Sequence, residues 1–404
     1  MAQVHTTARP RVERLSKAVL LALAVAVVLA VVSGAGLGES TTDGARLGGD
    51  YPAFHGAGSI VADGDIDDLY DPARQTAAQA GLGLDGYLAF AYPPHVAMAY
   101  APLSMLGFQL GYLVHTVLMS AALLGALAML RRPVPFIADH FWPIAAVAFT
   151  FHPLFTAIGG GQNTAVTVLL MAAIWRGLHD SSETLAGVAA GFLLFRPQYA
   201  VPMIGLLFLG RHLRAVGVAA GVGALTWLLV APFLGAGWIS TWVEQVVPFA
   251  ERDAEVNAAN SISLLGVAQA LLGADATSAR LLGGLGALAV IGAVSAVWLR
   301  VDLVPLAARM GLASVAVLLM SPHTMFYDAG LLVIAGASLL AGTTVDRSVA
   351  LRFAAVVWLG AFSHLFADRL GATPLALVVV AAFLTLIPGS LVESTPKKKV
   401  VLHA

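Results

Sequence analysis

Long apolar segments, separated by short polar turns, follow one another along almost the whole chain. A helix needs about 20 apolar residues to cross the hydrocarbon core of a bilayer, and several of these segments approach that length while others are shorter. The pattern therefore predicts an all-α polytopic membrane protein. The predicted spans lie at residues 15–38, 109–130, 139–158, 160–178, 183–195, 198–210, 213–234, 280–299, 303–320, 327–342, 349–366 and 372–388.

The basic residues predict how these spans thread through the membrane. Lysine and arginine concentrate in short cytoplasmic loops, and a single threading brings every basic cluster to that side. In this threading residues 91–107 either enter the membrane without crossing it or cross it and pair with another misassigned span; the three prolines of "YPPHVAMAYAPL" suit a broken or re-entrant helix. The prediction is roughly twelve transmembrane helices with both termini inside. The clusters are Arg131/Arg132, Arg176, Arg211/Arg214, Arg300/Arg309, Arg347/Arg352 and Lys397–Lys399.

A single membrane domain between two short cytoplasmic ends accounts for this pattern. The first apolar run follows several basic residues, so it reads either as a cleaved signal peptide or as a signal anchor; the many later spans favour the anchor. Both interpretations put residue 39 outside. The expected division is a cytoplasmic N-terminus at 1–14, a transmembrane domain at 15–390 with large outer loops at 39–108 and 235–279, and a basic cytoplasmic tail at 391–404.

Composition supports this class and excludes others. The chain is 59% hydrophobic and 11% charged, whereas a soluble domain carries about 25% charged residues. The net charge is only −1, and no basic stripe with interleaved aromatics points to nucleic acid. The chain has no cysteine, which excludes disulfides, thiol catalysis and zinc–thiolate sites. No cofactor or metal is expected.

Two motif-like stretches in the first outer loop do not meet the requirements of the sites they resemble. "DGDIDDLYDPAR" at 63–74 begins like a calcium loop, but Asp68 and Arg74 stand where such a loop has its glycine and its glutamate. "GLGLDG" at 81–86 has dinucleotide-binding spacing but follows no strand. The acidic cluster is therefore interpreted as a solvated structural turn.

Asp50 differs from the other acids of this loop. It follows Gly48 and Gly49 and precedes a stretch, 51–61, whose apolar residues recur at spacings of three and four. That spacing predicts a short amphipathic helix lying on the membrane surface. Asp50 then caps the helix, which local geometry favours, or acts as a general base at the surface.

Further polar residues collect at the outer turns. In "GGGQNTA" at 159–165, glycine N–H groups suit an anion or sugar, and Gln162 and Asn163 suit sugar hydroxyls; a plain inter-helix turn is the alternative. Arg196 lies between two apolar runs, on the side where arginine is disfavoured, and suits a phosphate better than a snorkelling position.

The stretch "LMSPHTMFYDAGLL" at 319–332 supplies two more candidates. His323 suits a base, a phosphate ligand or a sugar contact. Asp328 suits either the site or a helix cap.

Five stretches resemble, in order, the motifs of glycosyltransferase family 87, the polyprenol-phosphate-mannose-dependent mannosyltransferases of the GT-C superclass. They are "GGDYPAFHGAGSIVADGDIDDLYDP", "YPPHVAMAYAPL", "GGGQNTAVTVLLMAAI", "AGFLLFRPQYAVP" and "SPHTMFYD". This resemblance covers roughly residues 15–345. The chain departs from the family pattern at Arg196, where lysine is common, and at His55, where many relatives have an aromatic residue.

The resemblance implies a GT-C fold and a transferase that takes a hexose, mannose in the family, from a polyprenyl phosphate. Asp50 matches the catalytic base and His323 the active-site histidine. Substrate contacts fall to Arg196, Gln162, Asn163, Tyr92, Tyr327 and Asp328.

The expected partners are the lipid-linked donor, a glycolipid or cell-envelope glycan acceptor and membrane lipids, at the outer face of a bacterial plasma membrane. A transporter or lipid flippase fits the number of spans equally well, but it would place charges midway through broken helices. A partner subunit without activity is a third reading.

Overall fold

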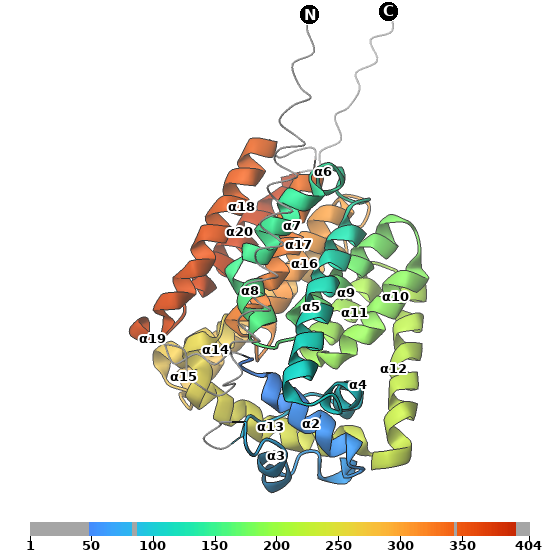
Figure 1. The fold of residues 1–404 in the computed structure, drawn as a ribbon. Coiled ribbons are helices and arrows are strands. Elements are labelled where there is room, and N and C mark those ends of the chain that lie inside the picture. The colour runs from blue at the N-terminus through green and yellow to red at the C-terminus, as the bar shows by residue number, and fades with distance from the viewer. Residues whose placement is uncertain (1–47, 83–86, 343–345, 393–404) are drawn as a thin grey trace, which may run out of the picture.

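The structure, a computed structural model, describes residues 48–82, 87–342 and 346–392 (Figure 1). The predicted first span at 15–38, the N-terminus at 1–14, most of the tail at 391–404 and the end of the "GLGLDG" stretch lie outside these residues. Within the described ranges the chain is helical and contains no β-strand, only an isolated bridge between Ser261 and Met325. The all-α prediction is confirmed.

Four described helices are long and apolar enough to cross a membrane, and a bent pair raises the number to five. The pair bends by 70° at Phe151, whose extended backbone separates its two helices. These elements match predicted spans closely. They are α5 (Phe108–Leu130), α12 (Leu213–Leu234), α15 (Thr277–Trp298), the run Arg347–Leu370 from α18 (Arg347–Ala361) through η5 (Phe362–Phe366) to α19 (Ala367–Leu370), and the pair α7 (Phe141–Thr150) and α8 (His152–Gly159).

The other predicted spans are present as shorter apolar helices, so the number twelve stays a prediction. They are α9 (Thr164–His179), α10 (Glu183–Phe192) with η2 (Leu193–Phe195), α11 (Pro197–Leu209), α16 (Leu306–Met320), η4 (Phe326–Leu331) with α17 (Leu332–Ala341), and α20 (Leu375–Val392). α6 (Pro135–Asp139) follows α5.

α16 is the centre of the bundle. Every residue from Arg309 to Leu319 is buried, as expected of a helix that is apolar on all sides. Around it, small residues let helices approach closely, which is how helices associate in a bilayer. A Cβ on Gly187 of α10, for example, would lie 2.4 Å from the carbonyl oxygen of Ala215 on α12.

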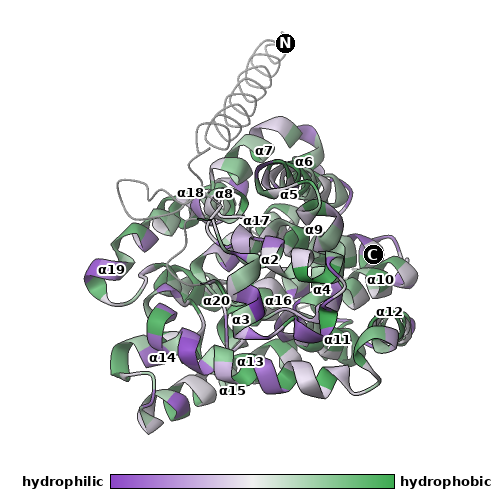
Figure 2. Cartoon of the chain, turned by 60° about the horizontal axis from the view of Figure 1, so that its bottom comes forward, coloured by the Kyte–Doolittle hydropathy of each residue, from purple (hydrophilic) through white to green (hydrophobic). Residues whose placement is uncertain are grey.

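Helices of the two large loops, most of them short, gather at one end of the bundle, here called the short-helix end, which lies at the bottom of Figure 1 and faces the viewer in Figure 2. They come from both large loops: α2 (Tyr51–Ala62), η1 (Ile66–Asp68), α3 (Pro72–Ala78), α4 (Pro94–Ser104), α13 (Trp238–Asn257), η3 (Ala258–Asn260) and α14 (Leu264–Leu272). α4 has 11 residues, about 17 Å of helix, which is too short to cross a bilayer.

The expected helix after Asp50 is present, but its predicted place on the membrane surface is wrong. Eight of the 12 residues of α2 are buried. Phe54 and Ile60 fill the core beneath it, and each such side chain contributes about 1.5–3 kcal/mol when fully buried. On another side Gly58 lies against the backbone of Tyr100 in α4, where a Cβ would be 2.7 Å from the carbonyl oxygen.

The opposite end of the bundle holds basic clusters that were predicted to share one side. Arg132 and Arg176 both pair with Asp180, after α9. The guanidinium of Arg347, at the start of α18, lies 5.2 Å from the ring centre of Phe136 in α6. The basic ends and the short-helix end are thus at opposite ends of the same bundle.

Candidate active site

A cavity of about 790 Å³ lies at the short-helix end. Its walls come from the start of α2, residues 87–93, the turn before α11, α13 and the segment from Pro322 to Asp328. The cavity brings together most residues that the sequence singled out. Its lining includes Asp50, Tyr92, Gln162, Arg196, His323, Tyr327 and Asp328. Asn163 does not line the cavity, but its side-chain oxygen accepts hydrogen bonds from Tyr92 and Arg196.

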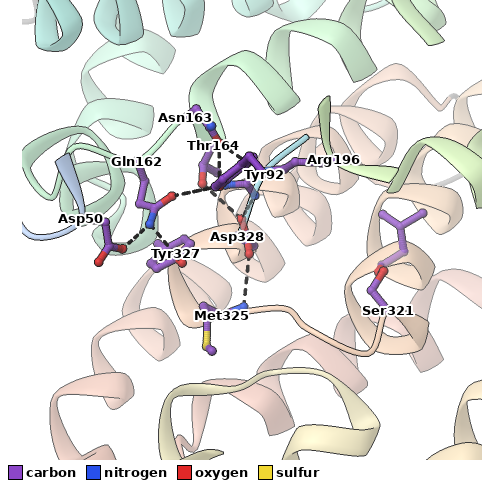
Figure 3. Close-up of polar contacts among 11 residues, drawn as sticks. Asp50, Tyr92, Gln162, Asn163, Thr164, Arg196, Ser321, Met325, Tyr327 and Asp328 are labelled. Carbon is purple, nitrogen blue, oxygen red and sulfur yellow. Dashed lines mark hydrogen bonds and ion pairs between the residues drawn. The ribbon is translucent and has the colours of Figure 1, made fainter. Parts of the chain in front are cut away.

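Asp50 does not cap α2, so the interpretation that local geometry favoured is wrong. Its carboxylate makes no hydrogen bond to the first turn of the helix. Instead the side-chain amide of Gln162 donates to Asp50 Oδ2 (Figure 3). Burial raises the pKa of Asp50 above its usual value, while the hydrogen bond from Gln162 opposes that shift. A carboxylate left free of the helix and raised in pKa is suited to accept a proton.

The glycine turn positions Asp50 through its carbonyl oxygens. The backbone N–H of Asp50 donates to Gly160 O at 2.9 Å, and that of Gly48 to Gly159 O at 3.2 Å. Gly161 has a φ of +76° and lies against Tyr51, where a Cβ would be 2.5 Å from the Tyr51 Cβ.

The glycine N–H groups do not face a ligand. Those of Gly160, Gly161 and Gln162 donate to the carbonyl oxygens of Thr156, Ile158 and Ala157 at the end of α8. The expected anion cradle is therefore wrong, because its donors are already used, and the turn acts as a junction between helices.

Arg196 is the centre of a buried polar network (Figure 3). Only 3% exposed, it pairs with Asp328 through Nη1, donates from Nε to Asn163 Oδ1 at 3.0 Å, and donates from Nη2 to the Tyr92 hydroxyl at 3.1 Å. A buried charge needs such compensation to remain ionised. The network fixes the guanidinium at the edge of the cavity.

Gln162 joins this network to Asp50. Its Oε1 accepts from Arg196 Nη2 at 3.4 Å, and its Nε2 donates to Asp50 and to the Tyr327 hydroxyl, the latter at 3.1 Å. One amide therefore connects the cationic and the anionic group of the site. Its orientation follows from these partners, since the oxygen must face the guanidinium.

Asp328 both caps a helix and pairs with a charge. Its Oδ2 accepts from the backbone N–H of Met325 at 3.2 Å, at the start of η4. Its Oδ1 accepts from Thr164 Oγ1 at 3.2 Å as well as from Arg196. The helix-cap reading of Asp328 is confirmed, and its role in the site stays a prediction for a side chain that lines the cavity.

His323 lines the cavity, and its partner there is Asp253 rather than Asp50. The distance from His323 Nδ1 to Asp253 Oδ2 is 3.2 Å. Sequence reasoning missed Asp253, which is one of four acids on α13. The only local signal is Asn257, one turn later, whose Nδ2 donates to Asp253 Oδ1 at 2.8 Å.

An aromatic cluster behind Asp50 was also missed. Tyr51 is fully buried, and its ring centre lies 5.3–5.4 Å from those of Phe108, Tyr112 and His115. Phe54 stacks on Tyr100 at 4.7 Å. The cluster holds the start of α2 rigidly, which fixes Asp50.

The acidic turn after α2 is structural, as expected. Arg74 forms ion pairs with Asp63 at 2.6 Å and Asp65 at 3.0 Å, and Asp71 caps α3 through Ala73 N and Arg74 N. These carboxylates lie on exposed surface, away from the cavity lining.

The sequence pattern that defines glycosyltransferase family 87 matches residues 90–322. That range is more than half of the chain and includes Tyr92, Gln162, Asn163 and Arg196 of the network. The chain belongs to glycosyltransferase family 87. Together with its apolar helices, this membership makes it an integral membrane protein.

A curated relative supports the family assignment. This family 87 chain is 34% identical over 143 residues to the polyprenol-phosphate-mannose-dependent alpha-(1-2)-phosphatidylinositol pentamannoside mannosyltransferase of Mycobacterium tuberculosis (strain CDC 1551 / Oshkosh). The match spans about a third of each protein, 33% of this chain and 32% of the relative. No solved structure matches.

In this family 87 protein, the cavity described above adjoins an apolar groove of about 550 Å³. The groove is lined by side chains of α11, α15 and the end of α16, among them Val201, Leu209 and Val294. Pro197, Gln198 and Pro322 line both spaces. The cavity that contains the charged groups therefore adjoins an apolar groove along the helices.

Proposed function

We propose that this protein is a GT-C membrane glycosyltransferase that transfers a hexose, mannose in the first instance, from a polyprenyl-phosphate donor to a lipid-linked or cell-envelope glycan. The observation that carries the proposal is Asp50: its carboxylate caps no helix, burial raises its pKa, and it lines a cavity that Arg196 also lines.

In this proposal Asp50 is the general base. The acceptor hydroxyl loses its proton as its oxygen attacks the anomeric carbon, and a carboxylate with a raised pKa is a stronger base than an ordinary aspartate. Gln162 holds the carboxylate in position through its amide. Tyr327 and Tyr92, whose hydroxyls bond to Gln162 and Arg196, offer contacts to sugar hydroxyls.

The cationic side of the site suits a phosphate. Arg196 lies at the edge of the cavity with a fixed guanidinium orientation, and planar guanidinium groups bind phosphate oxygens in two-pronged geometry. Such neutralisation stabilises the departing phosphate without a metal ion. A lysine at this position, common in the family, supplies the same charge.

The groove next to the cavity suits the lipid part of the donor. A polyprenyl phosphate has a charged head and a long apolar tail, and the shared residues Pro197, Gln198 and Pro322 join a polar space to an apolar one. The polar groups lie at one end of the bundle, next to the short helices. This arrangement favours a surface enzyme over a transporter, whose charges would lie midway along broken helices.

The basic clusters at the other end favour an active site that faces away from the cytoplasm. The proposed location is the plasma membrane of a bacterium, with the donor, the acceptor and membrane lipids as partners.

A donor panel tests the function directly. Purified protein in detergent or liposomes is supplied with a cell-envelope glycolipid extract and one radiolabelled donor at a time: polyprenyl-phosphate mannose, polyprenyl-phosphate glucose or a nucleotide sugar. We expect label in the lipid fraction from polyprenyl-phosphate mannose and none from the nucleotide sugar. The absence of transfer from every polyprenyl-phosphate sugar would overturn the proposal.

A further inference from the structure

An acid–histidine pair, Asp253 and His323, lines the same cavity as Asp50, and its two members come from different segments of the chain. Asp253 lies on α13, which crosses the end of the bundle near α2 (Figure 1). His323 lies in the turn between α16 and η4, and both residues line the cavity.

The carboxylate of Asp253 is held in one orientation. One oxygen accepts from Asn257 at 2.8 Å and the other faces His323 Nδ1 at 3.2 Å. The side chain of Asp253 is only 10% exposed, while that of His323 is 34% exposed. Burial raises the pKa of Asp253, but the hydrogen bond and the charge of His323 outweigh burial and hold that pKa below its usual value.

A carboxylate on Nδ1 decides what the imidazole can do. It accepts a hydrogen bond from Nδ1–H, fixes the ring orientation and stabilises the doubly protonated imidazolium. The other ring nitrogen, Nε2, has no protein partner in the part of the chain that the structure describes. It is therefore the nitrogen available to a substrate.

Acidic groups outnumber arginines in the lining of the cavity. Arg196 is already matched by Asp328, and Arg252, the other arginine of the lining, is exposed on α13. Asp50 and Asp253 add two negative charges, and a donor phosphate adds a third. The charged and titratable groups that line the cavity are Asp50, Tyr70, Tyr87, Tyr92, Arg196, Arg252, Asp253, His323, Tyr327 and Asp328.

We propose that Asp253 is a positioning residue that keeps His323 protonated, so that Nε2–H binds the phosphate leaving group of the donor. This inference rests on the proposed function. It assigns the two candidates of the site different tasks: Asp50 takes the proton of the acceptor, and His323 supports the phosphate.

The step balances as follows. The acceptor oxygen forms a bond to the anomeric carbon while the bond from that carbon to the phosphate oxygen breaks. The electron pair leaves with the phosphate, whose charge increases from −1 to −2, and the acceptor proton passes to Asp50. The imidazolium donates a hydrogen bond to the phosphate oxygen as that charge develops, which stabilises the transition state.

The test compares pH profiles of kcat and KM for wild type, Asp253→Asn, Asp253→Glu and the control Glu251→Gln, an exposed acid two residues away on the same helix that does not line the cavity. We expect Asp253→Asn to lower kcat at neutral pH by at least about tenfold and to shift the basic limb to lower pH, because the imidazolium has lost its counter-charge. Lower pH should restore part of the rate, Asp253→Glu should retain more activity than Asp253→Asn, and Glu251→Gln should match wild type.

A binding measurement separates this inference from the proposed function. Polyprenyl phosphate should bind wild type more tightly than it binds Asp253→Asn at neutral pH, and lower pH should narrow this difference. Inorganic phosphate and phosphatidylglycerol should not show the same dependence. An unmoved basic limb in active Asp253→Asn, or an equal dependence for all three phosphates, overturns the inference alone. A wild type that neither transfers nor binds polyprenyl phosphate overturns both.

Discussion

Asp50 is a residue whose chemistry is set by a partner 112 positions away in the sequence. The side chain precedes a helix, and nothing local distinguishes it from an N-cap. Only the packing of the glycine turn against Gly48 and Asp50 puts the amide of Gln162 on the carboxylate. The general-base candidate was predicted from the family resemblance, and its release from capping is a tertiary effect.

The raised pKa of Asp50 predicts a pH dependence. A general base must be ionised, so the rate falls as pH drops through the pKa of Asp50 in the folded protein. Because burial raises that pKa above its ordinary value of 3.8, the acid limb should lie above the range of an exposed aspartate. The measurement is kcat/KM across about pH 4 to 8, and an acid limb at or below pH 3.8 would contradict this account.

The pair of Arg196 and Asp328 should matter for stability as well as for binding. Both side chains are at most 5% exposed, and removing one partner of a buried pair costs about 3–5 kcal/mol, because the other charge stays buried. We expect Arg196→Ala to lower the thermal unfolding temperature clearly. Asp275→Asn, which removes the partner of Arg280 in an exposed pair, is the matched control and should leave that temperature unchanged. Equal effects would show that the Arg196 pair contributes little.

Most of the polar site could be predicted from residue type and position, because Gln162, Asn163, Arg196 and Asp328 all lie at breaks between apolar runs. Asp253 could not be predicted in this way, since it is one acid among several on an amphipathic helix. The role of the glycines was misjudged because a sequence does not reveal which N–H groups are already bonded.

Among the elements, the turn between α8 and α9 is the one that positions the site. Gly161 adopts a φ of +76°, and a Cβ there would lie 2.5 Å from the Tyr51 Cβ. Gly161→Ala should therefore push α2 away from the turn and separate Asp50 from Gln162. We expect loss of most transfer activity and a lower unfolding temperature.

Gly159 is the control in the same turn. A Cβ at Gly159 meets no atom within 4 Å, so Gly159→Ala should retain both activity and stability. If the two variants behave alike, the turn does not position Asp50 in the way described.

α2 illustrates what periodicity can and cannot predict. Apolar residues at spacings of three and four correctly indicated a helix. They gave no information on the other faces, where Gly56 contacts Gln79 and Gly58 contacts the backbone of Tyr100. Small residues on a second face permit close packing by α3 and α4, and so the helix is buried where a surface helix was expected.

For the whole molecule, the apolar pattern predicted the positions of the helices well. It did not establish how many of these helices cross the membrane. Long segments such as 109–130 and 213–234 match α5 and α12 within a residue. Whether a shorter segment crosses the membrane depends on its tilt, its bending and the helices packed against it, and hydropathy alone does not predict these. The 70° bend at Phe151 is an example, because a single apolar run became two helices.

The orientation of the molecule is testable because the chain has no cysteine. Single cysteines are introduced at Asp67, exposed at the short-helix end, and at His179, exposed near the basic clusters. In intact cells a membrane-impermeant thiol reagent should label Asp67→Cys and not His179→Cys, because the basic end is expected in the cytoplasm. The reverse pattern would place the cavity in the cytoplasm.

The most direct test of the central claim is the transfer rate of Asp50→Asn beside its affinity for the donor. The amide keeps the shape of the side chain but accepts no proton, so transfer of mannose from polyprenyl-phosphate mannose should fall by about 10²- to 10⁴-fold. Donor affinity and folding should be retained, because the substitution removes no contact to the phosphate. Transfer by Asp50→Asn at the wild-type rate would show that Asp50 is not the base.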